Sequence, residues 1–89
     1  MDYQEQYKRV LLSRAHCNLG KKGINEEFLN HVLRLLKRYK IIKIKALKSA
    51  ANKSNIKEIG NQLAQATESY LIDIRGRMII LSKYPLKKK

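Results

Sequence analysis

The chain has 89 residues, of which 20 are Lys or Arg and only seven are Asp or Glu, so its formal charge is +13. This length suffices for one small domain and excludes two, and a hydrophobic share of 44% is typical of a folded domain. The positive charge far exceeds what solubility requires. It predicts a polyanionic partner, with nucleic acid ranked ahead of an anionic membrane surface.

A single cysteine, Cys17, allows no disulfide and no Cys-based metal site within one chain, and it favours a reducing, cytoplasmic location. We expect Cys17 to be buried and His16 to be exposed, because neighbouring residues of a strand point to opposite faces. The polar N-terminal segment does not resemble a signal peptide, and no apolar run is long enough to span a bilayer. Without a convergent nucleophile, base or metal cluster, the sequence predicts no enzyme, no cofactor, no metal and no small-molecule substrate.

The first half of the chain predicts two helices separated by a short strand. Apolar residues recur at helical spacing over residues 2–15, and a short alternating run over 16–19 indicates a strand that ends at Gly20. Asn25 is a favourable N-cap residue, and the pattern after it predicts a second helix that continues to about residue 40.

A second strand and a third helix follow. Residues 41–47 alternate between apolar and lysine side chains, which is expected of a strand in a sheet with only one covered face. The third helix is predicted to begin at a cap formed by Asn52 or Ser54. Gly60 lies within this helix, where glycine costs about 1 kcal/mol relative to alanine, and therefore indicates close packing.

The last part of the chain predicts a β-hairpin. Residues 70–74 and 78–82 read as strands, joined by a tight turn in which Gly76 supplies the unusual φ. The predicted order is therefore α-β-α-β-α-β-β, with parallel crossovers through the helices and a final hairpin. We expect an α/β fold of the two-layer α+β kind, with a mixed four-stranded sheet, forming one domain over residues 1–85 and a basic tail over 86–89.

The most informative stretch is the turn Gly20-Lys21-Lys22-Gly23, called the GKKG turn below. Its glycines allow a sharp turn and a close approach to another molecule, and two lysines lie between them. The helix that begins after Asn25 offers unpaired N–H groups and the positive end of its dipole, both of which favour an anion. We expect the GKKG turn and Asn25 to hold a phosphate backbone.

Further cations are placed on a strand face, in a loop, beside the hairpin turn or in the C-terminal tail. The residues predicted to widen the contact are Lys43, Lys45, Lys53, Arg75, Arg77, Lys87, Lys88 and Lys89. Such contacts are electrostatic and independent of base sequence. Two lysines alone do not account for a charge of +13, so we expect these groups to share the binding.

The aromatic residues do not predict a stacking platform. Five of the six fall at core-like positions and leave only Tyr84 exposed; they are Tyr3, Tyr7, Phe28, Tyr39 and Tyr70. This pattern argues against base readout of the RRM kind and for recognition of backbone and shape.

Three stretches in order resemble the CRM domain, also called the YhbY-like family (chloroplast RNA splicing and ribosome maturation). They are residues 18–25 with the GKKG turn, residues 36–45 with the run from Tyr39 to Lys45, and residues 56–81 with Ile72-Asp73-Ile74-Arg75-Gly76. One departure is the short connection before the first strand, which lacks a proline. The resemblance implies a fold like the C-terminal domain of the bacterial initiation factor that binds the small ribosomal subunit, with RNA contact at the GxxG loop.

Single-domain members of that family associate with ribosome precursors, and multidomain plant relatives assist intron splicing. The resemblance therefore implies a protein that contacts ribosomal RNA, as an assembly factor or as a ribosomal component. We expect the free protein to be a monomer. An Alba-like chromatin or nucleic-acid-coating protein is the alternative, although such proteins carry a longer arginine-bearing hairpin. A third possibility is a basic membrane-surface or protein adaptor, but the helices leave no spare amphipathic face.

Overall fold

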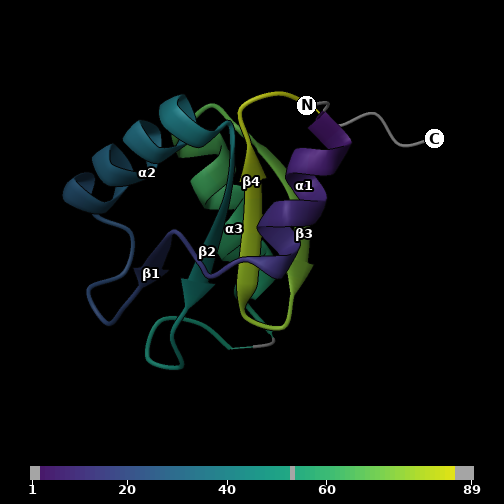
Figure 1. Ribbon diagram of the computed structural model, residues 1–89. Helices are drawn as coiled ribbons and strands as arrows, with labels where there is room; N and C mark the ends of the chain where they lie inside the picture. Colours follow the sequence, from purple (N-terminus) through teal and green to yellow (C-terminus); the bar gives the residue numbers. More distant parts are fainter. Residues whose placement is uncertain (1–2, 53, 86–89) are drawn as a thin grey trace.

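The computed structural model describes residues 3–52 and 54–85, except for the side chains of Tyr3 and Gln4. The elements along the chain are α1 (Tyr3–Leu12), β1 (Cys17–Leu19), α2 (Glu26–Tyr39), β2 (Ile41–Ala46), α3 (Ile56–Ala66), β3 (Tyr70–Arg75) and β4 (Met78–Ser82). The predicted order and the α+β class with a mixed four-stranded sheet are confirmed (Figure 1). Within the described residues, no helix has the length and apolar character needed to cross a membrane.

The strands lie in the order β1-β2-β4-β3. β1 is parallel to β2, with Cys17 opposite Ile44 and Leu19 opposite Ala46, whereas β4 is antiparallel to both of its neighbours. Because β4 lies between β2 and β3, those two strands run in the same direction and are joined through α3. The predicted parallel crossovers and final hairpin are present, and the last strand of the chain occupies the inside of the sheet.

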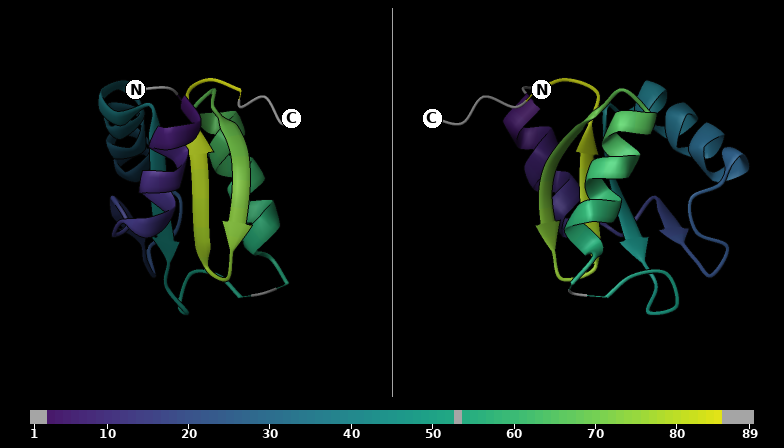
Figure 2. Two further views of the ribbon diagram at one scale, coloured as in Figure 1. Left: turned by 45° about the vertical axis from the view of Figure 1, so that its right-hand side comes forward. Right: turned by 180° about the vertical axis from the view of Figure 1, so that it is seen from behind.

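Helices cover both faces of the sheet. α2 and α3 lie on one face and α1 lies on the other, as the opposite views in Figures 1 and 2 show. The main core is formed between the sheet and the pair α2 and α3. Its fully or nearly buried members are Leu19, Val32, Leu36, Ile42, Ile44, Ala46, Ala51, Ile56, Leu63, Ala64, Ile79 and Leu81.

A smaller core lies under α1. Ile41 and Ile80 are completely buried there against Val10, and Tyr7 and Leu11 pack around them. The sequence predicted that only one face of β2 would be covered, and this prediction was wrong. α1 carries few apolar side chains, but these suffice to cover Ile41 and Ile80 on the second face.

A bulge in β3 changes which side chains face α1. Leu71 is opposite Leu81 and Asp73 is opposite Ile80, so Ile72 is an extra residue in the ladder. Ile72 packs into the core under α1, and Asp73 accepts a hydrogen bond from the hydroxyl of Tyr7 on α1. The bulge therefore places an apolar residue and a carboxylate in succession on the same face.

The N-terminal cap of α3 differs from the prediction, whereas the packing around Gly60 agrees with it. Its N-cap is Asn55, which makes no capping hydrogen bond, whereas the Asn52 side chain accepts from the N–H groups of Ser54 and Asn55 in the preceding turn. The predicted cap at Asn52 or Ser54 was therefore wrong. The close packing predicted at Gly60 is confirmed, because a Cβ there would lie 3.1 Å from a methyl group of Leu71.

Candidate nucleic-acid interface

The GKKG turn has one glycine that its backbone requires and one that it does not. Gly23 has a φ of +71°, in the left-handed region that favours glycine, and its N–H donates to the carbonyl of Gly20 at 2.9 Å. Gly20 lies outside that region, and a Cβ there would make only an ordinary contact with Leu47 at 3.8 Å. The fold itself therefore requires glycine at one end of the turn only.

The GKKG turn leads directly into a capped helix. Asn25 is the N-cap of α2, and its side-chain oxygen accepts a hydrogen bond from the N–H of Phe28 at 2.8 Å. The predicted cap is confirmed. Its hydrogen bond holds the first turn of α2 beside the two lysines, with the positive end of the helix dipole facing the same region.

An open hollow of about 370 Å³, called the GKKG hollow below, lies between the turn and the start of α2. Asn25, Glu27, Phe28 and His31 line it together with the four residues of the turn. Lys21 and Lys22 are exposed, and neither has a hydrogen bond or an ion pair with any described residue. The hollow thus has two available ammonium groups opposite a single carboxylate.

His31 was not among the predicted site residues. It lies four residues after Glu27 and three after Phe28, so all three share one face of α2. That spacing was visible in the sequence. What the sequence did not show was that this face, and not the opposite one, borders the GKKG turn.

A second hollow, of about 510 Å³, lies at the tip of the β3–β4 hairpin and is called the hairpin hollow below. It brings together three predicted residues, Lys45, Arg75 and Arg77, with Lys48, which was not predicted. Among the described atoms, the Nε of Arg77 is buried and has no hydrogen-bond partner.

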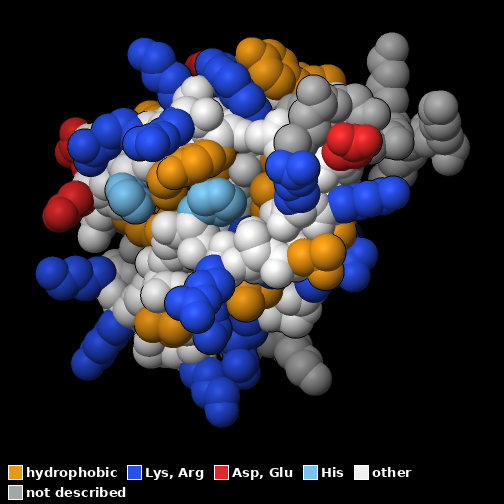
Figure 3. Space-filling model, viewed as in Figure 1, with side chains coloured by type: hydrophobic (Ala, Val, Ile, Leu, Met, Phe, Trp, Pro, Cys, Tyr) orange, Lys and Arg blue, Asp and Glu red, His pale blue; other side chains and the backbone are white. Residues whose placement is uncertain are grey.

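The two hollows lie at the same end of the sheet, where β1 and β2 end and β4 begins. The N–H of Leu47 donates to the carbonyl of Leu19, just before the GKKG turn, and the N–H of Ala46 donates to the carbonyl of Arg77 in the hairpin. Lys and Arg side chains gather at this end of the molecule, at the bottom of the view in Figure 3. The end of β2 therefore connects the two cationic regions directly.

Lys43 has a structural role that its sequence position did not reveal. Its ammonium group donates to the carbonyls of Leu11 at 2.9 Å and Ser13 at 3.0 Å, at the C-terminal end of α1. Cations are favoured at this end of a helix. α1 also ends at Leu12 and not near residue 15 as predicted.

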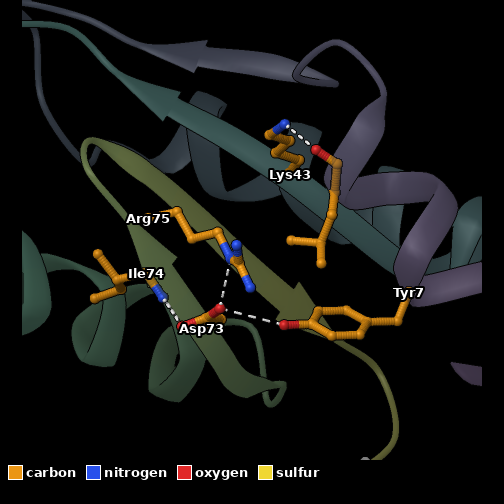
Figure 4. Close-up of polar contacts among 6 residues, drawn as sticks. Tyr7, Lys43, Asp73, Ile74 and Arg75 are labelled. Carbon is orange, nitrogen blue, oxygen red and sulfur yellow. Dashed lines mark hydrogen bonds and ion pairs between the residues drawn. The ribbon is translucent and has the colours of Figure 1, made fainter.

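Arg75 is also engaged within the protein. Its Nε donates to a carboxylate oxygen of Asp73 at 2.9 Å, and Tyr7 donates to the same oxygen at 3.3 Å (Figure 4). Burial alone raises the pKa of Asp73, but hydrogen bonds from Arg75, from the N–H of Ile74 and from Tyr7 outweigh it and lower the pKa below its usual value. Burial and the nearby Asp73 raise the pKa of Tyr7.

His16 and Cys17 differ from their predicted surroundings. Cys17 is half-buried against the main core, and burial raises the pKa of its thiol to about 11, so it stays protonated at neutral pH. His16 was predicted to be exposed, and this was wrong. It is half-buried, and its Nδ1 accepts a hydrogen bond from the N–H of Lys43 at 3.0 Å.

The prediction that nearly all aromatic residues lie in the core was wrong for two of them. Tyr39 is 38% exposed at the end of α2, and Tyr70 is 48% exposed at the start of the edge strand β3. Tyr7 and Phe28 are half-buried, and Tyr84 is exposed as expected. Both tyrosines follow the apolar spacing of their helix or strand. They lie at the ends of these elements, however, where no neighbouring element covers them.

Several predicted residues lie outside the part that the structure describes. These are Lys53 and the tail lysines Lys87, Lys88 and Lys89. The side chain of Tyr3 is also outside it. Their contribution to binding stays a prediction from the sequence.

Comparison with known proteins agrees with this fold. A family model for the CRS1/YhbY (CRM) domain matches residues 4–83, and the chain belongs to this family. The solution structure of the hypothetical protein SAV1595 from Staphylococcus aureus, described as "a putative RNA binding protein", is similar, with a TM-score of 0.71 and 26% sequence identity. The match covers 100% of this chain and 95% of that one. No curated protein matches in sequence.

Proposed function

We propose that this protein binds RNA and that the GKKG hollow captures the phosphate backbone. Membership of the CRM family and the description of the S. aureus neighbour both support RNA binding. The observation that carries the site assignment is the hollow of about 370 Å³ in which Lys21 and Lys22 have no described partner. Ammonium groups without an internal partner can neutralise phosphates without first breaking a contact of the fold.

In this mechanism, a phosphate enters the GKKG hollow beside the first turn of α2. Lys21 and Lys22 neutralise its charge, and the helix dipole adds to the attraction. The hairpin hollow, with Lys45, Lys48 and Arg77, holds a further part of the backbone at the same end of the sheet. The chain's own contribution is binding, and no catalytic step is part of the proposal.

The RNA partner that we propose is ribosomal RNA. The protein acts in the cytoplasm as a monomer when free, either as a ribosome assembly factor or as a component bound to a ribosomal subunit. The high positive charge supports a partner with densely packed phosphates. Crosslinking in cells, followed by sequencing of the bound RNA, tests this: reads concentrated on ribosomal RNA are expected, and reads spread over messenger RNA would contradict it.

The GKKG hollow is tested by charge reversal. Lys21→Asp with Lys22→Asp is expected to weaken binding of a structured RNA by at least about tenfold, because two attractive phosphate contacts become repulsive. Fluorescence anisotropy measures the affinity. The matched control is Lys8→Asp with Lys57→Asp, which changes the net charge equally at exposed positions of α1 and α3.

A fall in affinity that is equal in the two double variants would remove the GKKG hollow as the site. The salt dependence is a second reading, since replacing both lysines by alanine is expected to lower the log–log slope by about 2. Equal affinity for duplex DNA and structured RNA would instead favour an Alba-like nucleic-acid-coating function.

A further inference from the structure

One face of α2 continues from the GKKG hollow towards the other end of the sheet. His31, Leu35 and Tyr39 are spaced four residues apart, so they lie above one another on this face, and they are called the α2 stripe below. His31 lines the GKKG hollow, and Tyr39 lies about 12 Å further along the helix axis. The stripe thus begins where the phosphate backbone is proposed to bind.

The far end of the α2 stripe is an aromatic pair formed by two distant parts of the chain. The ring centroids of Tyr39 and His16 are 4.9 Å apart and tilted by 50°. His16 is held in place by two hydrogen bonds to Lys43. Its backbone N–H donates to the carbonyl of Lys43 at 2.7 Å, and its ring Nδ1 accepts from the backbone N–H of Lys43. Tyr39 nevertheless remains 38% exposed.

The ring of His16 presents a neutral hydrogen-bonding surface. Since Nδ1 accepts a hydrogen bond, the neutral ring carries its proton on Nε2, which can donate. Burial lowers the pKa of His16, and the positive charge of Lys43 acts in the same direction. The pair therefore offers flat aromatic surface and one N–H group at neutral pH.

Cations accompany the α2 stripe. Arg38 lies over the Tyr39 ring, with its guanidinium carbon 5.4 Å from the ring centroid, and Arg34 is exposed one helical turn earlier. Each arginine follows a member of the stripe by three residues, which places it on a neighbouring row of the helix surface. Both histidine side chains appear on the face shown in Figure 3, with hydrophobic side chains between them and Lys and Arg around them.

We propose that the α2 stripe and His16 bind unpaired bases of a single-stranded RNA segment whose backbone is held in the GKKG hollow. Tyrosine, histidine and arginine are the side chains on which unstacked RNA bases stack, and the flanking arginines complement the phosphates. A duplex cannot use this surface, because its base faces are already stacked. The inference rests on the proposed function and adds the class of RNA: single-stranded segments, bound through bases as well as backbone.

The test is Tyr39→Ala, with Tyr70→Ala as the matched control, because Tyr70 is an exposed tyrosine at the other edge of the sheet. Tyr39→Ala is expected to weaken binding of a single-stranded oligouridine by at least about fivefold, which is the lower end for loss of one base–aromatic stack. Affinity for an RNA duplex of the same length should be unchanged. Tyr39→Phe should bind the oligouridine like the unaltered protein, because it keeps the ring.

Equal losses for single strand and duplex, or equal effects of Tyr39→Ala and Tyr70→Ala, would overturn the proposal. If Tyr39→Ala does not fold, the proposal is tested by NMR on the unaltered protein. Oligouridine is expected to shift the signals of both the His16 and the Tyr39 rings. Unshifted ring signals in a bound complex would overturn the proposal. Charge reversal at Lys21 and Lys22 in the same assay separates the two proposals. If it abolishes binding while Tyr39→Ala has no effect, only the base-binding surface fails.

Discussion

The cations of the GKKG turn and those on the α1 side of the sheet have the same chemistry in the sequence but different surroundings in the fold. Lys21 and Lys22 are exposed around an open hollow, whereas Lys43 binds the end of α1 and Arg75 is paired with Asp73. A cation that already has a partner within the protein must give up that contact before it binds a phosphate. The net charge of the chain therefore overstates the number of cations that are available to bind a polyanion.

The largest expected difference between the two regions is in stability. Lys43→Ala is expected to lower the free energy of unfolding by about 1–2 kcal/mol, because the carbonyls of Leu11 and Ser13 lose a charged donor. Lys22→Ala should change it by less than about 0.5 kcal/mol, since the side chain is exposed and unpaired within the described residues. Urea unfolding measures both. Similar destabilisation by the two substitutions would break the comparison.

The two glycines of the GKKG turn provide a slightly smaller effect. Gly23→Ala is expected to cost about 1 kcal/mol of stability, because alanine is strained at its positive φ. Gly20→Ala should leave the thermal midpoint of unfolding almost unchanged, since the added methyl group would make only an ordinary contact with Leu47. Any loss of RNA affinity in Gly20→Ala would then report a close approach of RNA to the backbone. A clear drop in its thermal midpoint would contradict this reading.

The smallest effect concerns Asp73 and depends on pH. Its pKa is lower in the folded protein than in the unfolded chain, so its contribution to stability is complete above about pH 4 and is lost as the pH falls through the folded value. Asp73→Asn should therefore flatten the acid side of the stability profile, measured by urea unfolding at several pH values. Tyr7→Phe is the control, because it removes one hydrogen bond to Asp73 but leaves Arg75 in place. If the loss of stability at acid pH is the same in Asp73→Asn as in the unaltered protein, the ion pair between Asp73 and Arg75 does not stabilise the fold.

Much of the candidate site was predictable because it is local in sequence. The GKKG turn, the cap at Asn25 and the start of α2 lie within a few residues of one another, so glycine, lysine and capping preferences identify them together. Gly60 was similarly readable, since a glycine in a helix stripe indicates a close neighbour. His31 was missed because its place in the lining of the GKKG hollow depends on which helix face borders the turn.

The sequence by itself determined the seven elements, the class of fold and the turn at Gly20–Gly23, because helical and strand periods, caps and turns depend on neighbouring residues. Only the tertiary structure decided the position of β4 inside the sheet, the covering of Ile41 by α1 and the bulge at Ile72. These depend on how apolar faces distant in sequence meet and bury one another. For the same reason, only the fold separated the lysines that remain available from the one that stabilises α1.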